Sequence, residues 1–276
     1  MEISIWQAIV LGIVEGITEF LPISSTGHLT IVEELMGLSI EDSGVTAFTA
    51  VIQVGAIAAV LIYFAKDIGR LAAAWFKGLF SAQARQNHDY RFAWYVIAGS
   101  MPIALVGFAA KDFITGPLRS LWVVAAGLII WSGAMAFADH AATQLKDEKA
   151  LTLKDSLIIG FAQCLALVPG VSRSGATITT GLLRDFNRVT ATRLSFFLGI
   201  PALTAAGIYE LPDALKSDSV SMSSLAVGTV VSFVVAYASI AWLLKFVANH
   251  TLKVFIWYRV ILGVAIIGFL LWGPQA

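Results

Sequence analysis

Six polar side chains lie close together near the N-terminus of the 276-residue chain. Residues 12–30 read GIVEGITEFLPISSTGHLT and include Glu15, Glu19, Ser24, Ser25, Thr26 and His28. Glu15 and Glu19 are four positions apart, so on a helix they share one face, where two like charges repel. A bound cation, a shared proton or a polar pocket must therefore offset the two carboxylates.

The segment that follows the glutamates suits an anion. Pro22 ends the first helix, and the Ser-Ser-Thr-Gly run places hydroxyl groups and free backbone N–H groups where a second short helix can begin. Helix N-termini bind anions because their N–H groups and the helix dipole both favour negative charge. The first motif thus combines carboxylates with an anion site that includes Gly27.

A second motif, PGVSRSGAT, occupies residues 169–177 and contains a lone arginine, Arg173. A buried guanidinium needs a partner, and its planar fork matches phosphate oxygens. The alternative partner is Glu15 or Glu19, and both kinds of contact could hold at different stages of a reaction cycle. Residues that permit close backbone approach or donate hydroxyls surround the arginine: Gly170, Ser172, Ser174, Gly175 and Thr177.

The composition places both motifs in a membrane protein. Apolar residues make up 58% and charged residues 13% of the chain, and the mean hydropathy is +0.82. Soluble domains carry about 25% charged residues. The net charge is zero and basic residues do not cluster with aromatics, so no nucleic-acid partner is expected.

Two further features of the sequence exclude other elements. Cys164 is the only cysteine, which excludes an intramolecular disulfide. Lys66 is the first basic residue, so no cleaved signal peptide is expected.

The elements that must position the motifs are helices. Six apolar stretches have the roughly 17 to 25 residues that cross a bilayer: 46–65, 91–110, 120–138, 194–210, 224–245 and 255–273. Each motif instead joins two stretches that are too short or too polar to span: 5–21 with 28–38, and 157–168 with 175–183. This pattern predicts two re-entrant helical hairpins, with a full N-terminal span and a surface loop as the alternative.

An internal repeat favours the re-entrant interpretation. An offset of 148 places Gly12 on Gly160, Glu15 on Gln163, and residues 24–27 on residues 172–175. Three predicted spans follow each motif in the same order. We therefore predict an all-α membrane protein of one domain, 1–276, built from halves 1–145 and 150–276. Since a hairpin returns to its starting side and three spans is an odd number, the halves should be inverted, with a site near the midplane where the broken helices meet.

The basic residues predict the orientation. Thirteen of them fall on one side of the predicted topology: Lys66, Arg70, Lys77, Arg85, Arg91, Lys146, Lys149, Lys154, Arg184, Arg188, Arg193, Lys245 and Lys253. Three fall on the other side: Lys111, Arg119 and Lys216. The positive-inside rule makes the first side cytoplasmic, so the glutamate hairpin and both termini should be outside. Residues 66–91 suit either an amphipathic helix on the inner surface or a solvated loop.

Together, the blocks EGITEFLPISSTGH and PGVSRSGAT resemble the bacterial undecaprenyl-pyrophosphate phosphatase family. These integral-membrane enzymes recycle the lipid carrier of cell-wall (peptidoglycan) synthesis and influence bacitracin resistance. The resemblance covers the whole chain. It implies catalytic roles for Glu15, Glu19, Ser25, His28 and Arg173, and substrate contacts from Ser24, Thr26, Ser172, Ser174 and Thr177. It also implies a divalent cation and a site that faces the periplasm from the inner (plasma) membrane.

The expected substrate is a polyprenyl pyrophosphate, hydrolysed to the monophosphate and inorganic phosphate. Ser25 is the expected nucleophile, and His28 the base that moves its proton. Glu15 and Glu19 would bind Mg²⁺ or Ca²⁺, both of which prefer oxygen ligands. Alternatively, Glu19 polarises His28 or a water and the cation arrives with the pyrophosphate.

The repeat also predicts that Ser25 and Arg173 lie close together, because they occupy equivalent positions at the two hairpin tips. They should approach within about 10 Å, roughly one helix diameter. A transporter or flippase is the rival class, since it shares this architecture. The sequence leaves open which cation binds, whether water replaces Ser25 as nucleophile, whether the lipid is also moved across the membrane, and whether the chain forms a homodimer.

Overall fold

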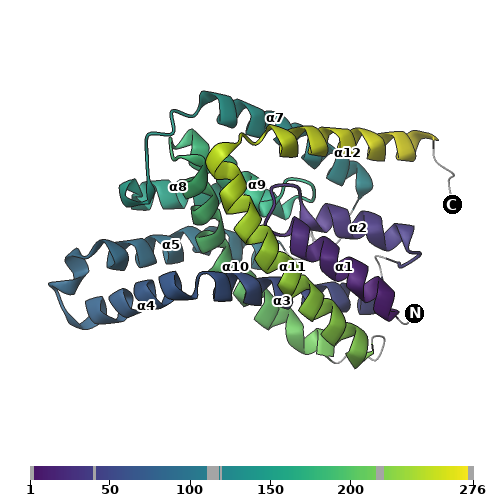
Figure 1. Cartoon of the computed structure of the whole chain (residues 1–276), viewed down its shortest axis with the longest axis horizontal. Coiled ribbons are helices and arrows are strands. Elements are labelled where there is room, and N and C mark those ends of the chain that lie inside the picture. Colours follow the sequence, from purple (N-terminus) through teal and green to yellow (C-terminus); the bar gives the residue numbers. More distant parts are fainter. Residues whose placement is uncertain (1–2, 40–41, 111–117, 119, 216–220, 273–276) are drawn as a thin grey trace.

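Helices dominate the computed structural model, which describes residues 3–39, 42–110, 118, 120–215 and 221–272 (Figure 1). Within these residues six helices are long and apolar enough to cross a membrane: α3 (Ser43–Tyr63), α5 (His88–Ala109), α7 (Leu121–Ala141), α10 (Arg188–Leu215), α11 (Met222–Asn249) and α12 (Lys253–Trp272). The shortest, α12, has 20 residues, about 30 Å at 1.5 Å per residue, which matches the hydrocarbon core of a bilayer. The six predicted spans and the all-α class are confirmed, and the chain is a multi-pass membrane protein.

Both motifs lie between short helices, as predicted. The first motif joins α1 (Ile5–Thr18) to α2 (Ser25–Leu35), and the second joins α8 (Leu153–Gln163) and a 3-10 turn, η3 (Cys164–Leu167), to α9 (Arg173–Leu183). Ser4 and Thr152, which precede α1 and α8, both form capping boxes that satisfy the first N–H groups of these helices. The offset of 148 that relates the motifs also relates the starts of α1 and α8 and those of α2 and α9.

Close helix packing holds the first helix pair in place. Helix α1 packs along α11, which also packs on α3. At Gly12 a Cβ atom would lie 2.6 Å from the Gly228 carbonyl oxygen of α11, so only glycine permits this approach. Small residues allow such contacts between helices in membranes. Helix α12 packs on α7, and α10 lies between α3 and α9.

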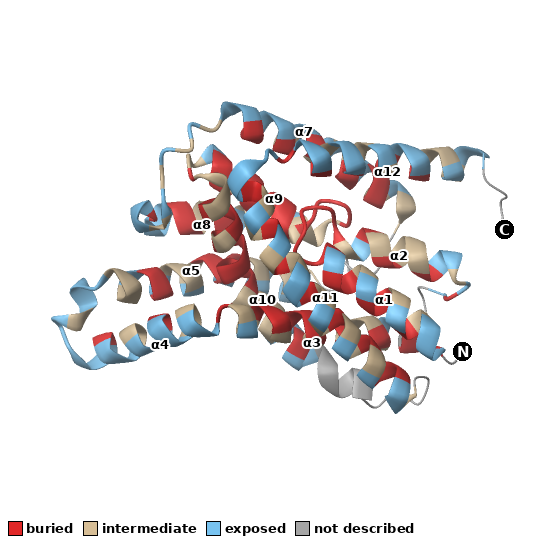
Figure 2. Ribbon diagram, in the orientation of Figure 1, coloured by how far each residue is buried: buried red, intermediate tan, exposed pale blue. Residues whose placement is uncertain are grey.

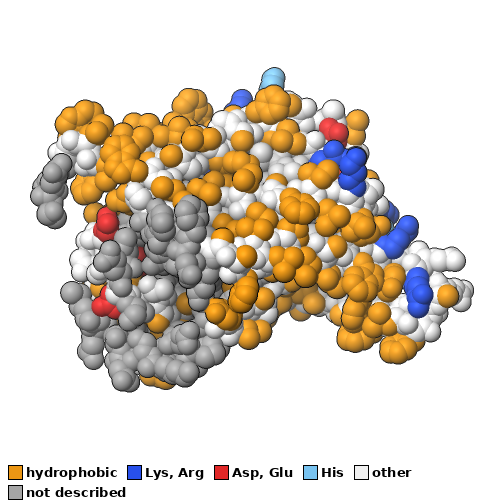
Figure 3. All heavy atoms as spheres, turned by 180° about the vertical axis from the view of Figure 1, so that it is seen from behind, with side chains coloured by type: hydrophobic (Ala, Val, Ile, Leu, Met, Phe, Trp, Pro, Cys, Tyr) orange, Lys and Arg blue, Asp and Glu red, His pale blue; other side chains and the backbone are white. Residues whose placement is uncertain are grey.

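Among the described residues, basic side chains gather at one end of the molecule (Figure 3). Helix α1 begins and α12 ends at one end, and the α4–α5 and α7–α8 connections lie at the other (Figure 1). The view from behind shows Lys and Arg gathered at the end with the α4–α5 connection, beside a broad hydrophobic surface (Figure 3). Ion pairs link segments there, such as Arg188 with Asp139 (2.6 Å) and Arg193 with Glu148 (2.9 Å). The three basic residues predicted for the opposite side, Lys111, Arg119 and Lys216, lie outside the described residues.

Residues 65–80 form helix α4 (Ala65–Phe80), followed by a 3-10 turn, η1 (Ala84–Gln86). The helix packs on α5 through one face, where Leu71 is buried, while Phe76 and Phe80 are exposed. Most of this segment is therefore a helix rather than a loop, and its place on the inner membrane surface stays a prediction.

Candidate active site

The two motif loops meet near the centre of the molecule, where they are buried (Figure 2). The backbone N–H of Gly170 donates to Ser24 Oγ (3.2 Å), and Ser174 Oγ donates to the carbonyl oxygen of Leu21 (2.9 Å). Gly170 has φ +91°, and a Cβ atom there would collide with the Val124 carbonyl oxygen of α7. The loops are thus held against each other and against α7.

The residues that precede α2 and α9 have the same unusual backbone conformation. Ser24 has φ +79° and Ser172 has φ +76°, a region that non-glycine residues rarely adopt. Such a residue costs on the order of 1–3 kcal/mol and persists only where its surroundings enforce it. Because Ser25 and Arg173 follow directly and open the two helices, the strained backbone determines where these two side chains begin.

The carboxylate of Glu19 is the centre of the cluster. Ser25 Oγ donates to Glu19 Oε2 at 2.8 Å, and Arg173 Nε lies 3.4 Å from Glu19 Oε1. Since one carboxylate contacts both residues, the expected approach of Ser25 and Arg173 within about 10 Å is confirmed. The ion pair of Arg173 with a motif glutamate is also observed, and its partner is Glu19.

Helix α10 packs against the guanidinium of Arg173. Arg173 Nη1 donates to the Ser195 carbonyl oxygen (2.9 Å), and a Cβ atom at Gly199 would collide with the guanidinium. The buried Thr177 hydroxyl contacts Ser195 Oγ at 2.7 Å and the Arg173 carbonyl oxygen at 2.9 Å. Arg173 is therefore held from one side by α10 and from the other by Glu19.

His28 does not contact Ser25 in this arrangement, contrary to the proton path expected from sequence. Its Nδ1 lies 2.7 Å from the Ser24 carbonyl oxygen and its Nε2 lies 2.6 Å from the hydroxyl of Tyr258 on α12. A carbonyl oxygen can only accept, so Nδ1 carries the proton, and the Tyr258 hydroxyl donates to Nε2. The group placed to accept the Ser25 proton is Glu19 instead.

Glu15 lies one turn before Glu19 and is 1% exposed, and its Oε1 has no hydrogen-bond partner among the described residues. An unpaired buried carboxylate oxygen is costly and calls for a ligand or a proton. No group of three or more His, Cys, Asp or Glu side chains that could hold a metal occurs in the described part of the chain. The pair still fits Mg²⁺, which proteins bind through one or two carboxylates with substrate phosphates and waters.

Two of the five hydroxyls that the resemblance assigned to substrate contacts, those of Ser24 and Ser174, join the two loops in this structure. Ser172 Oγ accepts from the Gly175 N–H (3.2 Å) and lies 3.1 Å from Ser174 Oγ, and both serines are buried. Thr26 differs, since its side chain is exposed in the first turn of α2. Gly27, also in that turn, is buried, and a Cβ atom there would lie 3.0 Å from Val124 Cγ1.

Three residues near the loops were not selected from the sequence: Ser195, Tyr258 and Arg259. Arg259 lies inside the stretch 255–273 that was predicted to span the membrane, and its charge at that depth was a usable signal. Ser195 contacts Arg173 through its backbone carbonyl, which no residue type reveals. Tyr258 carries no signal either, because tyrosine is common in membrane helices near interfaces.

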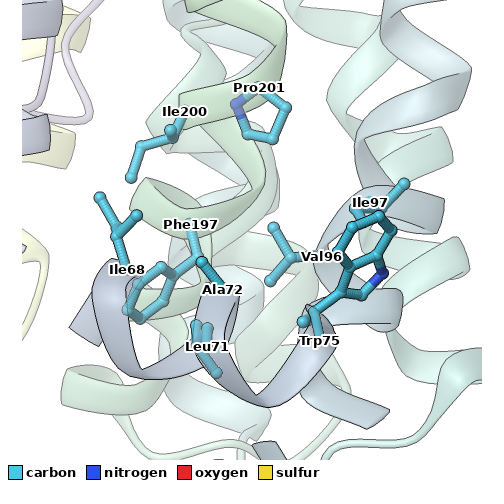
Figure 4. A pocket seen from close by; sticks show the side chains of 10 residues that line it. Ile68, Leu71, Ala72, Trp75, Val96, Ile97, Phe197, Ile200 and Pro201 are labelled. Carbon is cyan, nitrogen blue, oxygen red and sulfur yellow. The ribbon is translucent and has the colours of Figure 1, made fainter. Parts of the chain in front are cut away.

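The opposite face of α10 borders an apolar cavity of about 260 Å³ between α4, α5 and α10 (Figure 4). Trp75, Val96, Phe197 and Ile200 are among its lining residues, all of which are hydrophobic. Because its lining residues are hydrophobic, the cavity suits hydrocarbon rather than a phosphate.

The chain is similar to known proteins over almost its full length. It is 61% identical over 269 residues to undecaprenyl-diphosphatase 1 of Streptomyces coelicolor, covering 97% of this chain and 96% of that protein. It is 61% identical over 272 residues to undecaprenyl-diphosphatase 1 of Frankia alni, covering 98% of each chain. It is 54% identical over 274 residues to the undecaprenyl-diphosphatase of Cutibacterium acnes, covering 96% of each. A family model described as bacitracin resistance protein BacA matches residues 8–265. The chain belongs to the bacitracin resistance protein BacA family.

Proposed function

We propose that this chain hydrolyses undecaprenyl pyrophosphate to undecaprenyl phosphate and inorganic phosphate. The observation that carries the proposal is the single carboxylate of Glu19, which contacts both the Ser25 hydroxyl and the Arg173 guanidinium. The proposed nucleophile Ser25, the proposed base Glu19 and the phosphate-binding guanidinium of Arg173 thereby occupy one site. The names of the relatives, which are undecaprenyl-diphosphatases, support the same substrate.

In the proposed reaction Ser25 Oγ attacks the terminal phosphorus while Glu19 accepts the hydroxyl proton. The bond from that phosphorus to the bridging oxygen breaks, and undecaprenyl phosphate leaves with the proton that Glu19 had accepted. Water then attacks the phosphorus of the phosphoserine while Glu19 accepts a proton from this water. The bond from phosphorus to Ser25 Oγ breaks, Ser25 Oγ takes the proton from Glu19, and inorganic phosphate departs. Because phosphoryl transfer passes through a loose transition state, the protein contributes mainly positioning and charge stabilisation.

Arg173 would bind the terminal phosphate, exchanging its contact with Glu19 for contacts with phosphate oxygens. A guanidinium binds two such oxygens with parallel N–H bonds. The free N–H groups at the start of α9 add to this site. Glu15 and Glu19 would hold a divalent cation, Mg²⁺ or Ca²⁺, which would neutralise charge on the pyrophosphate when bound.

The proposal includes a membrane arrangement. The helix pairs α1–α2 and α8–α9 would be re-entrant hairpins of two inverted repeats, 1–145 and 150–276. Their common offset of 148 and the matching conformations of Ser24 and Ser172 support this relation. The basic end of the molecule would be cytoplasmic under the positive-inside rule, so that the site opens to the periplasm and both termini lie there, in the plasma membrane of a bacterium.

Phosphate release from undecaprenyl pyrophosphate by the purified protein in detergent tests the proposal. Ser25→Ala should abolish release, whereas Ser224→Ala should not. Ser224 is an equally suitable serine for deletion because it is buried and donates to the Ile3 carbonyl oxygen, away from the motif loops. A wild-type protein that binds the lipid without releasing phosphate would instead indicate the rival function, a lipid transporter or flippase.

A further inference from the structure

Arg259 of α12 is the largest fully buried side chain of the described residues, with 0% exposure. Its six hydrogen-bond acceptors are five backbone carbonyl oxygens and one hydroxyl, none of which carries a charge. Removing a guanidinium from water without a counter-charge is costly unless every donor is satisfied. All five of its N–H groups have an acceptor available. We call the five carbonyl oxygens and the hydroxyl that surround the guanidinium the cage of Arg259.

The cage joins three segments that are far apart in the sequence. Nη1 donates to the carbonyl oxygens of Pro22 and Val171, both at 3.1 Å, and Nη2 donates to that of Gly170 at 2.8 Å. Nη2 also contacts the carbonyl oxygens of Gly127 and Leu128 on α7, and Nε donates to Ser132 Oγ at 3.1 Å. One side chain therefore holds both motif loops against α7.

The held carbonyls lie one or two positions before the strained residues. Val171 precedes Ser172 (φ +76°), and Pro22 lies two positions before Ser24 (φ +79°). These two serines set the start of α9 at Arg173 and of α2 at Ser25. A strained conformation persists only where the surroundings over-determine it, and at both loops Arg259 supplies part of that constraint.

We propose that Arg259 is a positioning residue: it sets the distance between Ser25 and Arg173 by holding the backbone of both loops, and it does so without contacting the substrate. This inference rests on the proposed hydrolase function. Lysine is a poor replacement, because an ammonium is a compact charge with three donors and cannot reproduce the contacts of a planar, five-donor guanidinium with six acceptors. Ser132 orients the guanidinium through Nε and shares the role to a smaller extent.

The test compares Arg259→Lys and Ser132→Ala with Arg188→Lys, a control that breaks the short contact with Asp139 at the basic end of the molecule. For Arg259→Lys we expect kcat per folded molecule to fall on the order of 10²-fold while KM changes much less, since misplacement by about 1 Å costs that much. Ser132→Ala should lower kcat by a smaller factor, about three- to tenfold. Arg188→Lys should lower the thermal midpoint and leave kcat of the folded fraction unchanged.

A second readout is independent of activity. In a Cys164→Ala background, Ser25→Cys with Arg173→Cys should be joined by a short bifunctional cross-linker, and adding Arg259→Lys should lower the yield several-fold. Adding Arg188→Lys should not. Absence of hydrolysis in the wild-type protein would refute the proposed function, and the cross-linking would still decide the role of Arg259.

Folded Arg259→Lys with wild-type kcat and wild-type cross-linking yield would overturn the proposal. A loss confined to the thermal midpoint would also overturn it, because that is the effect of a purely structural residue. If Arg259→Lys cannot be purified in folded form, Ser132→Ala decides: a lowered kcat at unchanged KM supports the positioning role, and an unchanged kcat rejects it.

Discussion

Replacing Glu19 with glutamine separates the charge of this side chain from its shape. The amide oxygen of Glu19→Gln can still accept a hydrogen bond from Ser25, but it cannot accept the serine proton. General base catalysis contributes about 10²–10⁴-fold to the rate. At about 1.4 kcal/mol per factor of ten this equals roughly 3–5 kcal/mol of activation free energy. The variant should therefore lose on the order of 10²–10⁴-fold in kcat.

Glu19→Gln should have a second consequence, a loss of protein stability. Arg173 is 9% exposed at its side chain and would lose its anionic partner, so the variant should also be less stable in detergent. Phosphate release must therefore be divided by the folded fraction, measured by thermal unfolding of the same sample. Glu148→Gln is the matched control, since Glu148 pairs with Arg193 at 2.9 Å at the basic end. Its kcat should remain that of the wild type. A folded Glu19→Gln protein with near wild-type kcat would refute the role of Glu19 as the base.

Four further predictions follow from the same geometry. His28→Asn should cost less than about tenfold in kcat, because His28 contacts Ser24 and Tyr258 rather than Ser25; a loss like that of Glu19→Gln would restore His28 as the base. Arg173→Lys should lose about 10²-fold or more in phosphate release, because lysine cannot make two parallel contacts to one phosphate; wild-type activity would mean that a point charge suffices. Activity should disappear in excess chelator, and Glu15→Gln should raise the cation concentration that restores it; full activity in chelator would remove the cation from the site. In a Cys164→Ala background, cysteines at Ser81 and Ala150 should react with a membrane-impermeant reagent only from the cytoplasmic side and one at Leu35 only from outside; the reverse pattern would invert the proposed topology.

The sequence predicted the helical framework well because membrane helices leave a strong signal. Six apolar stretches of sufficient length and two interrupted ones could be assigned from hydropathy and from residues such as Pro22. The ends were less accurate. Helix α10 begins at Arg188, before the predicted 194, because Arg188 and Arg193 pair with acidic side chains and extend the helix beyond its apolar part.

The residues that meet at the two loops were predicted from the sequence, but some of their hydrogen-bond partners were not. The repeat brought Ser25 and Arg173 together correctly, since both open helices that follow equivalent loops. In the structure Ser25 contacts Glu19 rather than the expected His28, because a spacing of three residues allows contact on a helix but does not require it. Here the Ser24 carbonyl and Tyr258, which is 230 positions away, engage the imidazole instead.

Arg259 shows a different limit of the sequence. Its position within a predicted span indicated an unusual residue, but its partners are backbone carbonyls contributed by Pro22, Gly127 and Gly170, among others. Any residue type offers a carbonyl, so no pattern in the sequence identifies these contacts. Only the packing of α7 and α12 against the two loops brings them together.

The stereochemical course at phosphorus tests the central claim most directly, namely that Ser25 attacks the terminal phosphorus and forms a phosphoserine. The substrate would be undecaprenyl pyrophosphate with a chiral, isotopically labelled terminal thiophosphate, hydrolysed by the purified protein in oxygen-labelled water. Attack by Ser25 followed by attack of water inverts the phosphorus twice, so the account predicts net retention of configuration. Net inversion would show a single displacement by water and would contradict Ser25 as the nucleophile.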